Sequence, residues 1–500
     1  MDQEGRNSSG TAPAQTRSTI AKPFRLIPDK STGSESLANL QEMFLRTAFL
    51  TYSNLADQGK LAGMDKDSGL SLFPLTAGIN QREHLTIAGH DLCALAEEYG
   101  TPLYLYDGAT IRSQYQRLIA LCQRFYPAET LVAYASKAYF SLGFAARLAS
   151  LGAGADVVSL AEIHIAQRAG FPASVIHLHG NNKSQAELHA ALEWGIQAIV
   201  VDSLDELTFL EALAAGRKQA ARIWLRLTPD LNVKTHPHIE TGHAESKFGL
   251  HIQSGEAAEA IQRAAASPWL KLTGLHTHLG SQIFDSEPCR QAIQMLAQVA
   301  AENNYIPEEI SPGGGWGVRY TEADPADDIE PWVRAVTETV QDVCQLYGWP
   351  LPRLVLEPGR WLAARAGVAL YTVGTQKRTP QGTNIVAIDG GLADNPRVAL
   401  YQAHYTARVV QRSTTTPTEK MRVVGKFCES GDVLIPEILL PPVQRGDLLA
   451  VPVSGAYQLS MASNYNLAAR PPVLWLEEGN VEVLQEREQP DQPGWWTVTG

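Results

Sequence analysis

Short apolar runs alternate with helical patterns through the middle of the chain, and this alternation restricts the fold more than any other feature. Each apolar run is typical of a buried strand, and an amphipathic segment of helical period follows it. Strands that alternate with helices of this length build a parallel sheet. Eight strands are expected, over residues 131–136, 155–159, 175–180, 198–203, 222–227, 272–280, a weak strand that ends at residue 311, and 353–358. Eight such units close a (β/α)8 TIM-like barrel, so an α/β fold is predicted.

The helical period ends near residue 362, and short β-type runs separated by Gly, Pro, Asp and Asn follow. These runs indicate a C-terminal all-β domain over residues 363–500. Two further strand-like runs lie within residues 76–107, before the barrel, and are expected to join the β domain. The barrel, residues 108–362, would then be inserted into that domain.

The first 75 residues have a different character. They are rich in Ser, Thr, Gly and Pro up to about residue 36, which predicts a partly disordered extension, and residues 37–55 could form a short amphipathic helix. Asp2 and Glu4 stand where a secretory signal would carry basic residues. The expected location is the cytoplasm, although the serine and basic residues of the extension leave targeting to an organelle open.

Composition excludes several classes of protein. Hydrophobic residues make up 44% and charged residues 19%, which excludes a wholly disordered chain. The formal net charge of -12 argues against a broad nucleic-acid-binding face. No apolar run approaches the roughly 18 residues of a membrane span. Five scattered cysteines without a C-x-x-C pair indicate reduced thiols in a cytosolic protein.

Polar and glycine-rich motifs follow five of the eight predicted strands. Active sites of such barrels lie at the carboxyl ends of the strands. The motifs that would meet there are Lys137 after the first strand, HGNNKS after the third, HLGSQ after the sixth, PGGGWG after the seventh and EPGR after the eighth. Their clustering at one face predicts a single site.

Two of these motifs together predict pyridoxal phosphate. The glycines of PGGGWG permit positive φ and close backbone approach, so their N–H groups could cradle a phosphate, with a hydrogen bond from Ser281; a flexible turn is the alternative. Lys137 follows an apolar strand and is expected to be partly desolvated, which would favour a nucleophilic amine for a Schiff base. A solvated surface lysine is the alternative. A lysine and a phosphate cradle in one barrel mouth suit this cofactor.

Other side chains could complete the site, although each has a structural alternative. Glu357 could face the pyridine nitrogen or pair with Arg360 as a structural ion pair. His278 could stack on the ring, and His276 points to the same face of its strand. In the β domain, Arg397 could bind a carboxylate, as Arg360 could. The same domain also carries Tyr401, Cys428, Glu429 and Tyr457 in short polar motifs.

Nine motifs, taken in order, resemble those of the fold-type III pyridoxal-phosphate-dependent decarboxylases. They are YASKA, HGNNKS, SKFGL, HLGSQ, GGGWG, EPGR, DNPR-x-ALY, CESGD and GAY, and the resemblance covers roughly residues 78–474. The set is far more specific than any one motif. It implies the alanine racemase/decarboxylase fold of type III, in which a barrel is joined to a C-terminal β domain.

The resemblance implies a role for each matched residue. Lys137 and Cys428 would be catalytic, Lys137 holding the cofactor and Cys428 donating a proton to the carbanion. Cofactor contacts would come from Lys137, His278, Ser281, Gly315, Glu357, Gly359, Arg360 and Tyr457. Substrate contacts would come from Arg360, Arg397, Tyr401, Glu429 and Tyr457. No metal is implied, and the family works as a homodimer whose composite active sites take CESGD from the partner chain.

Within the family, the motifs are most similar to members that act on diaminopimelate. The implied reaction converts meso-2,6-diaminopimelate to L-lysine and CO₂, the last step of lysine biosynthesis. A related decarboxylase of arginine or ornithine ranks lower, because TGHAESKFG and the pair Arg397 and Tyr401 favour a substrate with a distal carboxylate. A racemase would not need CESGD or HLGSQ, and a non-catalytic relative would be expected to have lost Lys137 or Cys428. The sequence departs from the usual family pattern at Tyr139, Leu160-Ala161 and Val398. These departures remove no chemical group to which a role is assigned.

Overall fold

The computed structural model describes residues 69–231 and 246–489. All of them belong to one compact unit that begins at Gly69. The predicted extension lies outside the described residues as far as residue 68, and the predicted amphipathic helix at 37–55 lies entirely outside them. The first five residues of TGHAESKFG, 241–245, also fall outside the described part.

Eight parallel strands form a closed barrel. They pair in the order β9-β11-β12-β13-β5-β6-β7-β8, and β8 pairs with β9 to close the ring. The strands are β5 (Thr130–Ala135), β6 (Gly154–Val157), β7 (Ile176–Leu178), β8 (Ala198–Val201), β9 (Ala221–Thr228), β11 (Leu270–His276), β12 (Glu309–Ser311) and β13 (Arg353–Leu356), with β10 (Leu250–His251) beside β9. The predicted (β/α)8 barrel is confirmed.

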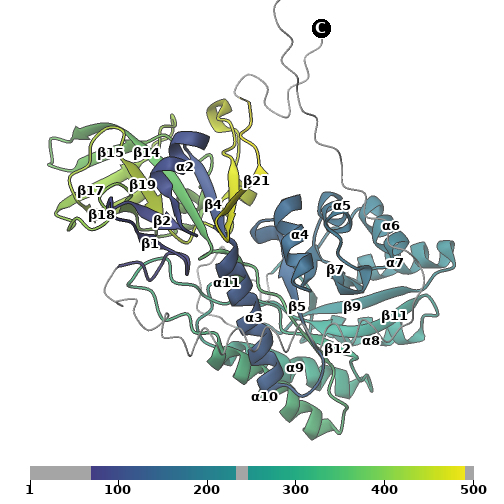
Figure 1. Cartoon of the computed structure of the whole chain (residues 1–500). Helices are drawn as coiled ribbons and strands as arrows, with labels where there is room; N and C mark the ends of the chain where they lie inside the picture. The colour runs from purple at the N-terminus through teal and green to yellow at the C-terminus, as the bar shows by residue number, and fades with distance from the viewer. Residues whose placement is uncertain (1–68, 232–245, 490–500) are drawn as a thin grey trace, which may run out of the picture. The chain divides into compact units, whose positions relative to one another are not determined.

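Helices follow the strands and surround the barrel (Figure 1). They are α3 (Gly108–Phe125), α4 (Leu142–Ser150), α5 (Leu160–Ala169), α6 (Gln185–Trp194), α7 (Leu204–Arg217), α8 (Glu256–Ala266), α9 (Glu287–Glu302), α10 (Glu330–Tyr347) and the short α11 (Arg360–Ala363). Ser159, Ser184 and Ser203 cap α5, α6 and α7, each accepting a hydrogen bond from the backbone N–H of a glutamate three residues later. These caps fix the turn from each strand into its helix.

Side chains of the barrel strands alternate between two packed layers, as the pleat requires. In β5, Leu131 and Ala133 belong to a small cluster in the barrel interior that is completed by Trp224. Val132 and Tyr134 pack instead in the large layer beneath the helices. The indole N–H of Trp224 donates to Glu309 Oε2 at 2.8 Å. The barrel interior therefore contains an apolar cluster and, in contact with it, the polar side chain of Glu309.

Two of the observed strands stop well before their predicted ends. The sixth predicted strand runs to residue 280, but β11 ends at His276. The eighth runs to residue 358, but β13 ends at Leu356. The residues between the observed and the predicted strand ends lie outside β11 and β13, so their backbone and side chains are available to form the site.

A second domain is built from strands that pair mostly antiparallel, with two parallel pairs, β15 with β17 and β4 with β20. Its main sheet has the order β18-β17-β15-β14-β4-β20-β21, and β19 joins β14 to β16. The elements are β4 (Leu103–Asp107), β14 (Gly367–Arg378), β15 (Asn384–Ile388), α12 (Arg397–Tyr401), β16 (Arg408–Val409), β17 (Glu419–Val424), β18 (Val433–Leu440), β19 (Leu448–Val451), β20 (Val473–Glu477) and β21 (Asn480–Gln485). The fold is thus a barrel with a separate sheet domain.

The two strand-like runs before the barrel have different positions. β4 lies between β14 and β20 in the main sheet of the β domain. The earlier run forms β2 (Leu85–Ile87), which pairs with β1 (Gly78–Ile79) and β3 (His90–Asp91) in a small sheet followed by α2 (Leu92–Tyr99). The chain therefore contributes one strand to the β domain before it enters the barrel.

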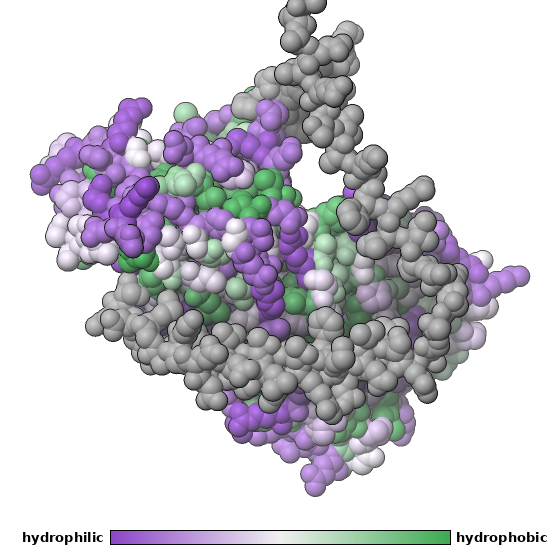
Figure 2. Space-filling model, in the orientation of Figure 1, coloured by the Kyte–Doolittle hydropathy of each residue, from purple (hydrophilic) through white to green (hydrophobic). Residues whose placement is uncertain are grey.

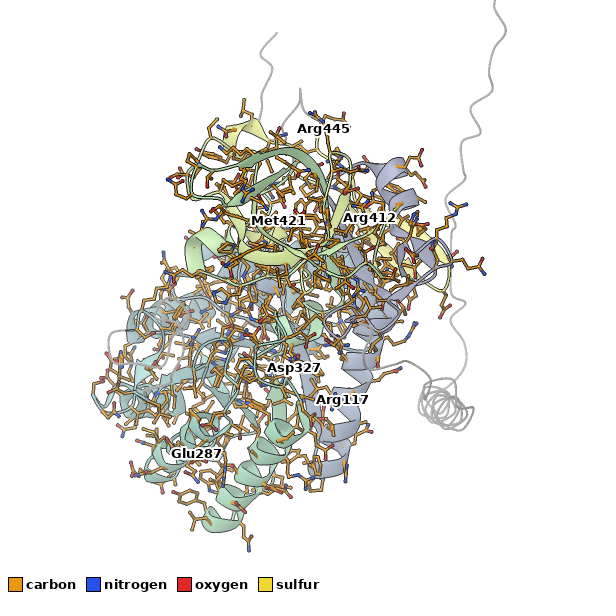
Figure 3. The ribbon with its side chains drawn as sticks, turned by 90° about the vertical axis from the view of Figure 1, so that its left-hand side faces the viewer. Arg117, Glu287, Asp327, Arg412, Met421 and Arg445 are labelled. Atoms are coloured by element: carbon orange, nitrogen blue, oxygen red, sulfur yellow. The ribbon has the colours of Figure 1, made fainter. Side chains whose placement is uncertain are left out.

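The outer strands of the β domain have a polar face. Residues of β17 alternate between exposed and buried positions, and hydrophilic side chains cover the end of the β domain that carries β17 and β18 (Figure 2). Met421 lies within this domain, whereas Arg445 and, on the barrel, Glu287 are exposed (Figure 3). No helix among the described residues is both long and apolar enough to cross a membrane.

Candidate active site

A cavity of about 620 Å³ opens at the carboxyl ends of the barrel strands and is also lined by residues of the β domain. Ten residues predicted for the site line it: Lys137, His278, Ser281, Gly315, Glu357, Gly359, Arg360, Arg397, Tyr401 and Tyr457. All five barrel motifs that were predicted to meet contribute residues to the wall of this cavity. HGNNKS contributes His179 and Gly180. The site is therefore concave and drawn from both domains.

Lys137 lies in a single 3₁₀ turn, Ser136–Ala138, directly after β5. Ser136 and Ala138 on either side of it are buried, whereas the Lys137 side chain is exposed. The expectation of a partly desolvated lysine therefore differs from the structure, because the cavity is open at this point. Ala138 accepts a backbone hydrogen bond from Tyr457 N at 2.8 Å, which ties the lysine turn to the β domain.

The glycines after β12 form a tight backbone cradle. Gly313 has φ +77°, and a Cβ there would lie 2.6 Å from Thr277 O and 2.7 Å from His278 Nδ1. Gly315 has φ +91°, and a Cβ there would collide with Gly280 O. Only glycine fits these positions without strain. The run therefore serves close packing between two site loops, and it leaves backbone N–H groups near the cavity.

His278 lies two residues past the end of β11. Its Nδ1 accepts a hydrogen bond from Gly314 N at 3.3 Å, which orients the imidazole against the glycine loop. Burial and the nearby charge of Lys137 hold the pKa of His278 well below its usual range. The ring is therefore neutral at pH 7, which suits stacking against another flat group.

Glu357 is a buried carboxylate held by two donors. His276 Nε2 lies 3.0 Å from Glu357 Oε2, and Ser311 Oγ donates to Glu357 Oε1 at 2.6 Å. Burial raises the pKa of Glu357, but the attraction of His276 and His179 and these hydrogen bonds outweigh it and leave the pKa well below its usual range. The partners of Glu357 are thus His276 and Ser311, not Arg360, and the carboxylate is an anion at neutral pH.

Two arginines from different domains approach each other in the cavity. Arg360 begins α11 at the end of the barrel, and Arg397 begins α12 in the β domain; both are buried. Arg360 donates to Ser281 Oγ through Nη2 at 2.9 Å and to Tyr320 Oη through Nη1 at 2.6 Å. Arg397 Nη1 donates to the same Tyr320 hydroxyl at 2.9 Å and to Tyr405 Oη at 2.6 Å. The cavity therefore contains two fixed cationic groups.

Tyr401, Gly359 and Tyr457 complete this wall. Tyr457 has φ +64°, an uncommon conformation for a non-glycine residue. The Arg360 guanidinium lies 4.6 Å from the centre of its ring. A Cβ at Gly359 would lie 3.3 Å from Tyr457 Oη, so a small residue at this position leaves room for the phenol.

Cys428 and Glu429 do not line the cavity of their own chain. They lie in the exposed loop between β17 and β18. Cys428 N donates to Asn466 Oδ1 at 3.0 Å, and Tyr465 Oη donates to Cys428 O at 3.1 Å. The loop is thus held in place at the surface, away from the ten residues that meet.

Sequence reasoning missed several cavity residues. Asp156 and Arg226 lie near the carboxyl ends of β6 and β9, and Tyr320 lies in the loop after β12; all three line the cavity. The signal for Asp156 and Arg226 was a charged residue within an apolar strand. Tyr139, one of the departures from the family pattern, is buried and stacks on Tyr106 with ring centres 5.1 Å apart. Its role is therefore in packing.

The residues present fit pyridoxal phosphate. The glycine cradle would accept a phosphate through backbone N–H groups, His278 offers a neutral ring for stacking, and Glu357 offers an anion to a protonated ring nitrogen. Lys137 supplies an accessible primary amine on the same cavity. The four groups are what this cofactor needs.

Known proteins match most of the chain. Residues 110–364 match the model of the family described as pyridoxal-dependent decarboxylase, pyridoxal binding domain. The chain is 42% identical over 419 residues to the diaminopimelate decarboxylase of Bacillus subtilis (strain 168), a match that covers 83% of this chain and 95% of that protein. The chain belongs to the diaminopimelate decarboxylase family of pyridoxal-dependent decarboxylases.

Solved structures of family members have the same fold. A diaminopimelate decarboxylase from M. jannaschii in co-complex with L-lysine is 35% identical, with a TM-score of 0.77 over 83% of this chain and 96% of that chain. The enzyme from Helicobacter pylori, complexed with L-lysine, is 32% identical, with a TM-score of 0.74 over 80% of this chain and 98% of that chain. The family predicted from the nine motifs is confirmed, and with it the use of pyridoxal phosphate.

Proposed function

We propose that this chain is a diaminopimelate decarboxylase, which removes one carboxylate of meso-2,6-diaminopimelate as CO₂ and releases L-lysine. This would be the last step of lysine biosynthesis. The observation that carries the proposal is one cavity that joins Lys137, the anionic Glu357 and the two buried arginines Arg360 and Arg397. The related diaminopimelate decarboxylase of Bacillus subtilis, and lysine in two related structures, support the same substrate.

The cofactor would be held by residues at the strand ends. Lys137 would bond it covalently, Ser281 and the loop around Gly315 would hold its phosphate, and His278 would cover one face of its ring. Bound pyridoxal phosphate supplies a ring that accepts the electron pair left when the substrate loses its carboxylate. Glu357 would keep a proton on the facing ring nitrogen, because its carboxylate is anionic. Gly359 and Tyr457 would border the same group.

Arg360 and Arg397 would bind the carboxylate that the substrate keeps. A guanidinium paired with the leaving carboxylate would stabilise the ground state, and such uniform binding does not speed the reaction. Two arginines on the carboxylate that remains instead orient the substrate without opposing the loss of CO₂. Tyr401 lines the same wall of the cavity and would add a hydrogen bond.

Cys428 would return a proton to the carbon that loses CO₂, and Glu429 would contact the substrate. Both lie outside the cavity of their own chain, so a second chain would have to supply them. We therefore include in the proposal a homodimer with composite sites, with no nucleic-acid or membrane partner. The five free cysteines support a cytoplasmic location.

Arginine and ornithine are poorer candidates as substrates. Each carries one carboxylate and a cationic side chain, and the cation would approach two buried guanidiniums. Like charges in a buried site repel strongly. A non-catalytic role is also disfavoured, because Lys137 is exposed to the cavity and Cys428 is present.

A substrate panel tests the proposal. The purified chain with added pyridoxal phosphate receives meso-diaminopimelate, arginine or ornithine in separate reactions, and CO₂ and the amine product are followed. Lysine from meso-diaminopimelate alone is expected, and it should be absent with Lys137→Ala. Agmatine or putrescine would overturn the substrate assignment, and no product from any of the three would reject the activity.

A further inference from the structure

We propose that Tyr320 is a positioning residue for substrate recognition, whose hydroxyl joins Arg360 and Arg397 and holds both guanidiniums ready for the carboxylate that the substrate keeps. The inference rests on the proposed function and extends it to a residue outside the nine motifs. It concerns how the two arginines, one from each domain, are kept at a fixed separation.

The hydroxyl of Tyr320 lies between the two guanidiniums. It accepts from Arg360 Nη1 at 2.6 Å and from Arg397 Nη1 at 2.9 Å. The guanidinium carbons lie 5.8 Å and 5.0 Å from the centre of its ring. One phenol therefore contacts both cations through its oxygen and both through its ring. Without it, the remaining side-chain hydrogen bonds of each arginine would lie within its own domain, from Arg360 to Ser281 and from Arg397 to Tyr405.

The backbone of Tyr320 is firmly held. Asp324 Oδ2 accepts from Tyr320 N at 2.9 Å and from Thr321 N at 2.7 Å. Two residues earlier, Val318 N donates to Gln282 Oε1 at 2.9 Å, and Val318 O accepts from Gln282 Nε2 at 3.1 Å. Gln282 belongs to the HLGSQ motif. The loop that carries Tyr320 is thus braced against the loop after β11, which suits a residue that must hold others in position.

The two arginines lack a carboxylate partner within residues 69–231 and 246–489. Their side-chain hydrogen bonds go to hydroxyl groups of Ser281, Tyr320 and Tyr405. Arg397 Nε is buried and has no hydrogen-bond acceptor in this part of the chain. A buried guanidinium with an unused N–H calls for an anion. The substrate carboxylate would be that anion.

The electrostatics of the phenol agree with this geometry. Burial raises the pKa of Tyr320, but the two guanidiniums outweigh it and lower the pKa below the ordinary value. The phenol oxygen is therefore strongly polarised toward the cations. It partly offsets their mutual repulsion while the substrate is absent.

The test compares two phenol-to-phenyl substitutions in the full-length holoenzyme, Tyr320→Phe and Tyr126→Phe. Tyr126 is a matched control, because it is buried and its hydroxyl donates at 2.6 Å to Pro352 O, outside the cavity lining. Initial rates with meso-diaminopimelate give kcat and KM. Binding of L-lysine, which keeps one carboxylate, and of 1,5-diaminopentane, which has none, is titrated by the absorbance of the bound cofactor.

For Tyr320→Phe, KM and the dissociation constant of lysine should rise together by roughly 10- to 100-fold, the effect of losing a hydrogen bond to a charged group. The kcat, the amount of bound cofactor and the binding of 1,5-diaminopentane should stay close to wild type, because the lost contact acts on the carboxylate alone. Tyr126→Phe should leave all of these quantities near wild type.

Three results would overturn the proposal: equal KM values for Tyr320→Phe and Tyr126→Phe, a fall in kcat with KM unchanged, or equal weakening of lysine and 1,5-diaminopentane. If Tyr320→Phe does not fold, Tyr320→His replaces it. Its imidazole can accept a hydrogen bond from one guanidinium but cannot bridge both, so the same shifts are expected. A wild-type protein that makes no lysine would reject the proposed function, while the two titrations would still decide the role of Tyr320.

Discussion

The glycine after Pro312 offers the sharpest test of how the site is assembled. Gly313 connects three parts of it: its N–H donates to Ser311 Oγ at 3.1 Å, its carbonyl accepts from Glu357 N at 3.1 Å, and a Cβ would lie 2.7 Å from His278 Nδ1. The substitution Gly313→Ala therefore adds one methyl group between the strand-end residues that we assign to the cofactor.

The size of the effect follows from two contributions. The positive φ of +77° costs an alanine about 1–2 kcal/mol. The methyl carbon would lie 2.6 Å from Thr277 O, whereas real contacts of this kind stay beyond 3.0 Å, so the loops must separate by at least 0.4 Å. A misplacement of 1 Å in an active site costs about 100-fold in rate. A shift of this smaller size should lower kcat/KM by about tenfold.

The matched control is Gly348→Ala at the end of α10. Gly348 has φ +67°, and a Cβ there would meet nothing within 4 Å. Both variants should melt at a lower temperature than wild type, but only Gly313→Ala should lose cofactor affinity and kcat/KM. Equal kcat/KM values in the two variants would refute the reasoning, because backbone strain alone would then account for the effect of Gly313→Ala.

Three further predictions concern charge and assembly. Glu357→Gln should lower kcat by about 100-fold or more without loss of the fold, because a neutral amide no longer balances a protonated ring nitrogen; steady-state rates and a circular dichroism spectrum check this. Burial raises the pKa of Asp394 to about 6, so the folded state holds a proton that the unfolded state has lost above pH about 4, and stability falls as pH rises. Between pH 5 and 7, the unfolding free energy measured by chemical denaturation should fall by about 1 kcal/mol more in the wild type than in Asp394→Asn. An equal change of unfolding free energy with pH in the two proteins would contradict this prediction. Lys137→Ala and Cys428→Ala should each be inactive, yet mixing and refolding them together should restore about a quarter of wild-type activity, because half of the dimers would carry one intact site; no recovery would contradict a composite site.

The barrel could be predicted from sequence because its signals are local. Apolar runs of strand length between helical segments gave all eight strands, including the weak one that became β12. The cluster of motifs was also predictable, since parallel strands bring their carboxyl ends to one face. His278 and Glu357, which lie 79 residues apart in sequence, meet for this reason.

The remaining features depend on contacts that a sequence pattern does not contain. Tyr320 looks like an ordinary loop aromatic, and only the packing of α11 and α12 brings two arginines to its hydroxyl. The partnership of Glu357 with His276 was likewise not foreseen, because the sequence offered Arg360 as the nearer charge. The exposure of Lys137 reflects the opening of the cavity, which strand periodicity cannot reveal.

The central claim is that this cavity turns meso-diaminopimelate into lysine. The most direct measurement follows lysine and CO₂ together from purified wild-type protein with pyridoxal phosphate, beside Lys137→Ala under the same conditions. One lysine for each CO₂ from the wild type, and neither from the variant, is the expected result. Lysine formation that persists in Lys137→Ala, or CO₂ without lysine from the wild type, would contradict the account.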